Sequence, residues 1–204
     1  MGSHSPGQTR YTNRLKRGRR KPLPREAKQQ LLEACKDDLD RLIVIVLLQT
    51  GLRVSEFCRV RSDSINWRTG FIHVTGKGSY DREVWMPALT KRTLSEWLQR
   101  HDRVPLGPRG VQVRLRKIAE RSKITQKVCP HVLRHTFAVD AVRKGVSVRA
   151  LQLALGHEDL NTTAIYLNMT AMDMADEFRQ AERSPGVPGT LGRVGSEDLG
   201  GDLL

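Results

Sequence analysis

The stretch of sequence that decides the fold is PHVLRHTFAVDAVRKGVSVRALQLALGHEDLNTTAIY, residues 130–166. It contains a His-x-x-Arg pair (His131 and Arg134), a second histidine after a glycine (His157) and a tyrosine nine residues further on (Tyr166). Arginine can bind a phosphate, histidine can move a proton, and a tyrosine phenol can act as a nucleophile. This combination points to phosphoryl-transfer chemistry.

The chain is strongly basic. Its 204 residues include 35 Lys and Arg against 22 Asp and Glu, which gives a formal net charge of +13 and a pI near 10.3. A basic surface on a folded domain indicates a polyanionic partner such as nucleic acid. A generally basic protein without such a partner is the alternative that charge alone leaves open.

Composition argues against a membrane protein, a secreted protein and a metalloprotein. No apolar run in the sequence approaches the roughly 18 residues of a transmembrane helix, and the first residues lack the apolar core of a signal peptide. The three cysteines are far apart and lack metal-site spacing, which is typical of reduced thiols in a cytosolic protein: Cys35, Cys58 and Cys129. We therefore expect no metal, no cofactor, no membrane contact and a cytoplasmic location.

The two ends of the chain differ from its middle. Residues 1–22 form a basic arm that we expect to be flexible until it meets an anion, and Met1–His4 within it are typical of a cloning remnant. The arm's candidate DNA-binding residues are Arg14, Lys16, Arg17, Arg19, Arg20 and Lys21. A solubilising tail is the alternative interpretation. Residues 184–204 are Gly-rich and mildly acidic, and we expect a flexible tail.

Residues 23–183 are predicted to form one domain, mainly α with a small antiparallel β-sheet (α+β). The predicted helices are 24–35, 38–49, 54–60, 90–101, 110–122, 131–144, 148–155 and 171–183. The helix at 38–49 is apolar on nearly all sides, which predicts a central buried helix. Thr90 and Ser147 are expected as N-caps, and Gly145 and Gly156 as helix ends. Strands are predicted at 71–75 and 83–87, joined by a hairpin turn at 76–81.

Three more residues are candidates for a phosphate-binding site. Arg53 follows a Thr-Gly-Leu turn at a helix start, and Glu56 three residues later could orient it. Lys77 lies between two glycines at the hairpin tip, where the backbone can approach a ligand closely. Taken singly, each has an ordinary alternative: a surface Arg–Glu pair and a solvated turn lysine.

The residues of the opening stretch also have ordinary alternatives. His131 and Arg134 share one helix face near its N-terminus, but a lone pair of this kind is usually a surface pair. His157 could stabilise a helix C-terminus, and Tyr166 could be a core tyrosine. His135 is expected to be packed or to support the site from behind.

Four short sequence motifs contain these candidates and together resemble a known family. They are TGLRVSE (50–56), VTGKG (74–78), PHVLRHTFA (130–138) and LGHEDLNTTAIY (155–166). Over about residues 24–183 the chain resembles the tyrosine recombinase and phage integrase family, and is most similar to its Xer-like branch. The resemblance implies the tyrosine-recombinase catalytic-domain fold.

The resemblance also implies a role for each candidate. Arg53 and Arg134 would bind the scissile phosphate, and Lys77 would be the general acid to the leaving 5′ oxygen. His131 would hydrogen-bond the phosphate or move a proton, His157 would fill the family's His/Trp position, and Tyr166 would be the nucleophile. Glu56 matches an acidic residue that supports the first arginine. No metal would be required.

The implied function is site-specific DNA recombination or integration through a 3′-phosphotyrosyl intermediate. Double-stranded DNA would be the partner, with four protomers on two DNA sites and a C-terminal segment docked on a neighbour; a segment folded back on its own domain is the alternative. The family also carries a core-binding domain ahead of the catalytic one. The host would be prokaryotic or a mobile element, with the protein at the nucleoid. Two other functions stay open: a type IB topoisomerase-like enzyme and a catalytically silent DNA-binding domain.

Overall fold

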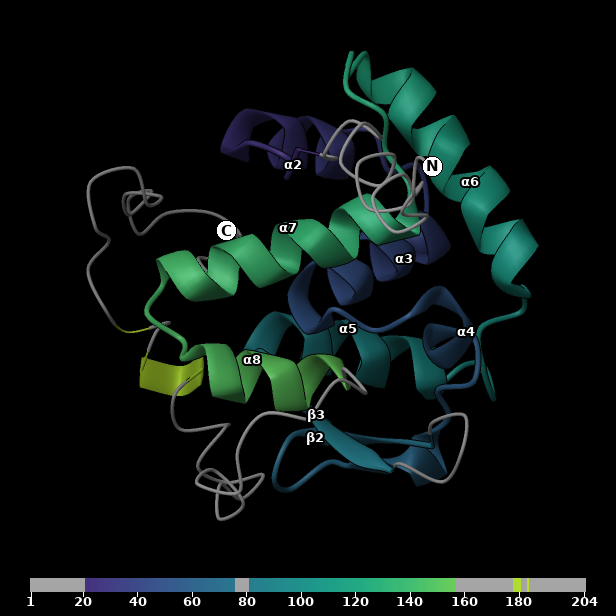
Figure 1. Ribbon diagram of the computed structural model, residues 1–204. Helices are drawn as coiled ribbons and strands as arrows, with labels where there is room; N and C mark the ends of the chain where they lie inside the picture. Colours follow the sequence, from purple (N-terminus) through teal and green to yellow (C-terminus); the bar gives the residue numbers. More distant parts are fainter. Residues whose placement is uncertain (1–20, 76–80, 157–177, 181–182, 184–204) are drawn as a thin grey trace, which may run out of the picture.

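The computed structural model describes residues 21–75, 81–156, 178–180 and 183 (Figure 1). The arm up to residue 20, the hairpin tip at 76–80 and the tail at 184–204 lie outside the described residues. Two predicted boundaries, those of the arm and of the tail, therefore stay predictions.

Helix α3 (Asp38–Thr50) is the central element, as its sequence predicted (Figure 1). Its residues 42–47 are all buried. The Asp37 side chain accepts a hydrogen bond from the Asp40 N–H at 2.9 Å and so caps the N-terminus. At the other end Gly51 has a left-handed φ of 64°. Helix α3 packs against α5 (Ala88–Leu98), α6 (Pro108–Ser122) and α7 (Pro130–Arg143).

Ion pairs join the outer helix α6 to α3 and the outer helix α2 (Arg25–Glu33) to α7. Asp40, only 2% exposed, accepts hydrogen bonds from Arg114 Nε at 2.6 Å and from Arg121 Nη2 at 2.5 Å, which holds α6 on α3. Helix α2 is joined to α7 by an ion pair of 2.7 Å between Lys28 and Asp140. Such pairs specify the arrangement, because breaking one leaves a buried charge uncompensated.

The sheet has three antiparallel strands in the order β1-β2-β3. A short 3-10 helix (Ser62–Ser64) leads into β1 (Ile65–Asn66), which pairs with β2 (Phe71–Val74). Strand β3 (Arg82–Trp85) returns along β2, with Val74 opposite Arg82. The predicted fold class, mainly helical with a small antiparallel sheet, is confirmed.

Helix α8 (Val148–Leu155) lies between α7 and the sheet and packs against β3 (Figure 1). It begins and ends where the sequence predicted. Ser147 Oγ accepts a hydrogen bond from the Ala150 N–H at 3.1 Å, and Gly156 has a left-handed φ of 61°. Because α8 ends at Gly156, its last carbonyls are fixed in space beside β3.

Some local predictions were wrong. Helix α5 begins at Ala88, directly after Pro87, so Thr90 is not its N-cap. Thr90 is instead fully buried in the first turn and donates a hydrogen bond to Gln49 Oε1 at 2.7 Å. Helix α4 (Val54–Phe57) is shorter than predicted, and β1 was missed because a two-residue strand has no alternation to detect.

The C-terminal segment contacts the body of the same chain through Phe178. Its ring, 8% exposed, stacks on Phe137 of α7 at a centroid distance of 5.8 Å and on Trp85 of β3 at 6.0 Å. Of the predicted helix at 171–183, residues 178–180 and 183 are described, and they are helical. The ring contacts concern residue 178 alone, so docking on a neighbour and folding back on its own domain both stay predictions.

Candidate active site

Arg53 is placed by the sharp end of α3. After Gly51 the chain turns, and Arg53 takes an extended conformation as the N-cap of α4. The carboxylate of Glu56 accepts hydrogen bonds from the Arg53 backbone N–H at 2.7 Å and from Arg53 Nη1 at 2.9 Å. The Arg53 side chain stays 44% exposed, whereas that of Glu56 is 3% exposed. The prediction that Glu56 orients Arg53 therefore has a direct geometric basis.

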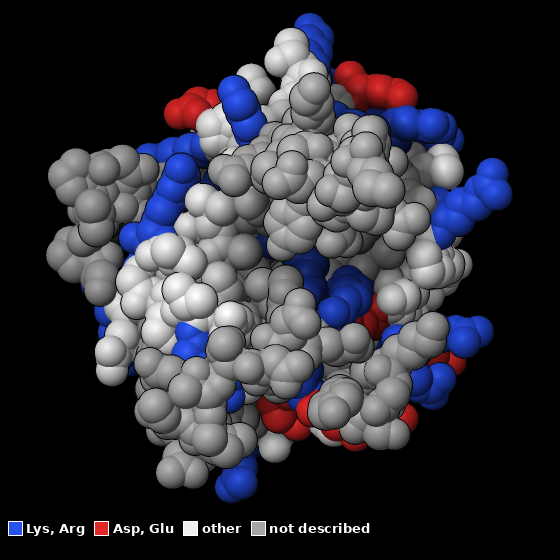
Figure 2. Space-filling view, viewed as in Figure 1, with Lys and Arg blue, Asp and Glu red and all other residues white. Residues whose placement is uncertain are grey.

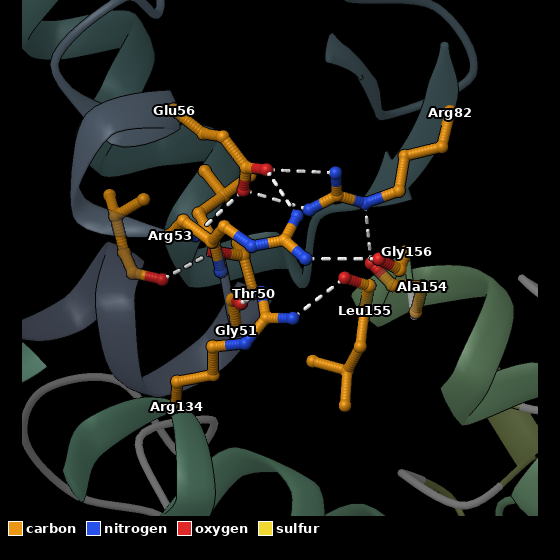
Figure 3. Close-up of polar contacts among 11 residues, drawn as sticks. Thr50, Gly51, Arg53, Glu56, Arg82, Arg134, Ala154, Leu155 and Gly156 are labelled. Carbon is orange, nitrogen blue, oxygen red and sulfur yellow. Dashed lines mark hydrogen bonds and ion pairs between the residues drawn. The ribbon is translucent and has the colours of Figure 1, made fainter. Parts of the chain in front are cut away.

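Glu56 has a second partner that the sequence did not reveal. Arg82, at the start of β3, donates from Nη1 to Oε1 at 2.9 Å and from Nη2 to Oε2 at 2.8 Å (Figure 3). The two parallel bonds form a bidentate pair, the strongest arrangement between these groups. Arg82 was missed because it lay one residue before the predicted strand, in a pattern with no signal for a buried carboxylate partner.

Arg134 approaches from the first turns of α7. Its Nη1 donates to the Gly51 carbonyl at 2.5 Å and its Nη2 to the Leu155 carbonyl at 2.6 Å. These bonds use two of the five N–H donors of a guanidinium. They also hold its plane between the end of α3 and the end of α8, so the side chain arrives in a fixed orientation.

The last carbonyls of α8 hold the three arginines together (Figure 3). The Ala154 carbonyl accepts from Arg82 Nε at 2.9 Å, and the Gly156 carbonyl accepts from Arg53 Nη2 at 3.0 Å. The Leu155 carbonyl accepts the hydrogen bond from Arg134 that is described above. A helix C-terminus carries a partial negative charge and free carbonyl acceptors, and both favour cations. We call Arg53, Arg82 and Arg134 the arginine cluster.

The arginine cluster is not neutralised by the acid beside it. Three guanidinium groups meet one carboxylate, so positive charge is in excess. Burial, with the nearby charge of Arg53, lowers the pKa of Arg134 to about 10. Burial alone would raise the pKa of Glu56, but hydrogen bonds from Arg82 and Arg53 outweigh it and hold that pKa at about 2. Figure 2 shows Lys and Arg side chains at a hollow near the middle of one face. Such a site attracts an anion.

His131 lies one helical turn before Arg134 on α7, and its side chain is exposed. His135 is exposed as well, so the first of its two expected roles, packing in the core, was wrong, and support of the site from behind stays a prediction. Lys21 is exposed at the start of the described chain. The other predicted site residues lie outside the described residues: Lys77, His157, Tyr166, Arg14, Lys16, Arg17, Arg19 and Arg20. The structure thus brings together Arg53, Glu56 and Arg134, with Arg82 added to them.

Within the described ranges, no group of three or more His, Cys, Asp or Glu side chains is placed to hold a metal ion. In the same part of the chain, no helix has both the length and the apolar character needed to cross a membrane.

Comparisons with known proteins agree with this geometry. The sequence profile described as the phage integrase family matches residues 21–172. Tyrosine recombinase XerA of Pyrococcus furiosus is 34% identical over 178 residues, which cover 79% of this chain and 62% of XerA. Tyrosine recombinase XerC of Pseudomonas syringae pv. syringae is 34% identical over 180 residues, which cover 79% of this chain and 60% of XerC. The chain spans roughly three-fifths of the length of these curated relatives.

Solved structures share the fold. The crystal structure of XerA recombinase matches with a TM-score of 0.63 and 30% identity, over 81% of this chain and 65% of that chain. The structure of the lambda integrase catalytic core matches with a TM-score of 0.57 and 21% identity, over 68% of this chain and 92% of that one. The second match concerns the fold alone.

A helical domain with a small antiparallel sheet and convergent arginines at a helix C-terminus is of the tyrosine recombinase catalytic-domain class. The chain belongs to the phage integrase family. The resemblance found from the four sequence motifs is thereby confirmed.

Proposed function

We propose that this chain is the catalytic domain of a site-specific DNA recombinase that breaks and rejoins DNA through a covalent bond to Tyr166. The observation that carries the proposal is the arginine cluster. Arg53 and Arg134 converge from α4 and α7 on one point, with an excess of positive charge and, in Arg53, an exposed guanidinium. Membership of the phage integrase family supports it independently.

In the proposed reaction the two arginines bind the non-bridging oxygens of one DNA phosphate. Negative charge grows on these oxygens in the transition state, and fixed donors that need no reorganisation stabilise it best. The carbonyls of Gly51, Leu155 and Gly156 already hold the two guanidinium groups in place. His131, exposed at the start of α7, would add a hydrogen bond to the phosphate or carry a proton.

The transesterification conserves the energy of the phosphodiester bond. The Tyr166 phenol gives its proton to a base, a role that His131 could fill, its oxygen attacks phosphorus, and the bond from phosphorus to the 5′ oxygen breaks. Lys77 would give the departing 5′ oxygen a proton, and His157 would contact the phosphate. A 5′ hydroxyl from another strand can then reverse the attack and release Tyr166. Rejoining needs no external energy source, because one ester bond replaces another at every step.

The proposed partner is double-stranded DNA. The net charge of +13 supports it, as does the similarity to recombinases solved in complex with DNA, among them XerH bound to palindromic difH substrate. Recombination would involve a homotetramer on two DNA sites. We place the reaction in the prokaryotic cytoplasm at the nucleoid, where DNA is accessible and widely separated cysteines stay reduced. The domain division, with an arm to residue 22 and a tail from 184, belongs to this proposal.

The test is covalent trapping. A nicked suicide duplex, which loses its short 5′ hydroxyl fragment after cleavage, should accumulate a protein–DNA adduct visible on a denaturing gel. Tyr166→Phe should abolish the adduct and leave DNA binding within about threefold of wild type. An adduct that persists in Tyr166→Phe would place the nucleophile elsewhere. Relaxation of supercoiled plasmids of any sequence would point to a topoisomerase-like enzyme instead.

A further inference from the structure

Arg82 is almost entirely enclosed by the site and yet is not one of the residues proposed to touch DNA. Its side chain is 10% exposed, and it donates three hydrogen bonds, two to the Glu56 carboxylate and one to the Ala154 carbonyl. These bonds join β3 to α4 and to the end of α8, three elements that are far apart in the sequence. Figure 3 shows the hydrogen bonds of Arg82 to Glu56 and to the Ala154 carbonyl.

The role of Arg82 follows from how Glu56 divides its hydrogen bonds. The Arg82 guanidinium donates to both carboxylate oxygens, whereas the Arg53 guanidinium donates a single bond, from Nη1 to Oε1, and the Arg53 backbone N–H donates to Oε2. A carboxylate with one arginine partner would prefer the bidentate pair with that partner. Without Arg82, Glu56 would therefore pair fully with Arg53 and pull its guanidinium toward the protein interior.

Arg82 also fixes the helix end that orients the other two arginines. It holds the Ala154 carbonyl, and the next two carbonyls of α8 bind Arg134 and Arg53. The close approach depends on Gly156. A Cβ at this residue would lie 3.0 Å from Arg82 Cδ and 3.1 Å from its Nε, and φ there is 61°. The chain thus has a glycine where an added side chain would require Arg82 to shift by a few tenths of an ångström.

We propose that Arg82 is a positioning residue for DNA cleavage: it occupies the Glu56 carboxylate and the end of α8 so that Arg53 and Arg134 face the phosphate. The inference rests on the proposed function, since it concerns the same site. It assigns Arg82 no contact with DNA.

The experiment compares Arg82→Gln, Arg82→Lys and Glu56→Gln with the double variant Arg82→Gln/Glu56→Gln. Cleavage of the suicide duplex is followed in single turnover, with protein in excess and well below each variant's melting temperature. Arg82→Gln should cleave about 100-fold more slowly, because displacement of a catalytic group by about 1 Å has a cost of that order. DNA affinity should change less than threefold.

The double variant separates positioning from mere structural support. Neutralising Glu56 removes the anion that would capture Arg53, so the double variant should cleave about tenfold faster than Arg82→Gln alone. A double variant as slow as Arg82→Gln, or slower, would overturn the proposal. Arg82→Lys keeps a positive charge beside the buried carboxylate, so this variant is expected to stay folded. Because lysine lacks the planar fork, Arg82→Lys should still cleave about tenfold more slowly than wild type. A wild-type rate for either Arg82 variant would also overturn the proposal.

Arg100→Gln is the matched control. Arg100 forms an ion pair with Asp38 at 2.9 Å, and both side chains are more than half exposed. Its hydrogen bonds go to Asp38 and to the Glu96 carbonyl, and neither residue belongs to the arginine cluster. It should cleave at the wild-type rate. If the wild-type protein itself forms no adduct, the proposed function fails; if it does and Arg82→Gln is equally fast, only the role of Arg82 fails.

Discussion

Arg134 shows how a single side chain can be prepared for an anion before the anion arrives. It is bound to two backbone carbonyls, at 2.5 and 2.6 Å, and neither carries a full negative charge. Its positive charge is therefore oriented but not neutralised. Burial and the nearby charge of Arg53 lower the pKa of Arg134 to about 10, because both disfavour this charge in the absence of a counter-ion. A DNA phosphate between the two arginines would supply that counter-ion.

We predict that Arg134→Lys lowers the rate of suicide-duplex cleavage at least 100-fold at pH 7, while DNA affinity falls less than threefold. Lysine loses the planar fork that reaches both carbonyls and a phosphate, and loss of one such donor has a cost of about 10²–10³ in rate. Single-turnover cleavage and a filter-binding titration would measure the two effects. Equal losses in both would contradict a role in the transition state.

The same variant should acquire a pH dependence. Burial and Arg53 lower the pKa of the native arginine, and they would act on a lysine whose ordinary pKa is already lower, about 10.4. The lysine would lose its proton, and with it its charge, as the pH rises. The cleavage deficit relative to wild type should therefore grow from pH 7 to pH 9. A constant ratio over this range would contradict the burial of charge at this position.

At the scale of elements, the site is built at helix ends. Gly51 is the C-cap of α3, Arg53 is the N-cap of α4, and Gly156 is the C-cap of α8. Each end leaves backbone groups without partners in the helix, and the arginines take up these acceptors. The two glycines allow the ends to come close. A Cβ at Gly51 would lie 2.4 Å from Phe137 Cδ1 and 2.9 Å from Leu155 Cδ2.

We predict that Gly51→Ala destabilises the protein by roughly 2–4 kcal/mol. The left-handed φ of 64° contributes about 1–2 kcal/mol and the overlap with Phe137 the rest. Urea unfolding would measure the change. Gly107→Ala is the control, because φ there is −78° and no atom lies within 4 Å of the added Cβ. It should lose less than about 1 kcal/mol, the cost of a weaker N-cap. Equal losses in the two variants would contradict the packing argument.

The sequence predicted both ends of α8 well, since each has a local chemical signal. The glycine at the end of α8 and Ser147 at its N-cap are signals that lie within a few residues of the helix end that they mark. Arg82 and Thr90 were not predictable in this way. Their roles depend on Glu56 and Gln49, which are distant in the sequence and near only in the fold. Arg53 and Arg134 could be named from the sequence, but their shared dependence on α8 could not.

At the scale of the whole molecule, the buried acidic side chains of the body contrast with the basic arm. Within the body, the side chains of Asp40 and Glu56 are buried and accept hydrogen bonds from arginines. The basic arm ahead of Pro22 contains a run of Lys and Arg without acids beside them in the sequence. Much of the net charge of +13 therefore lies in this arm, whose Lys and Arg have no acidic neighbours in the sequence.

We predict that replacing the six candidate arm residues with glutamine weakens DNA binding and flattens its salt dependence. The residues are Arg14, Lys16, Arg17, Arg19, Arg20 and Lys21. Each neutralised phosphate releases about 0.9 counter-ion, so the slope of log K against log salt should fall in magnitude by up to about 5. Titrations between 50 and 200 mM salt, values chosen to span a strong response, would measure it. Arg100→Gln/Arg61→Gln removes exposed charges from ion pairs and should change the slope by less than 1. If the arm only keeps the protein in solution, the slope will not change, because no phosphate contact is lost.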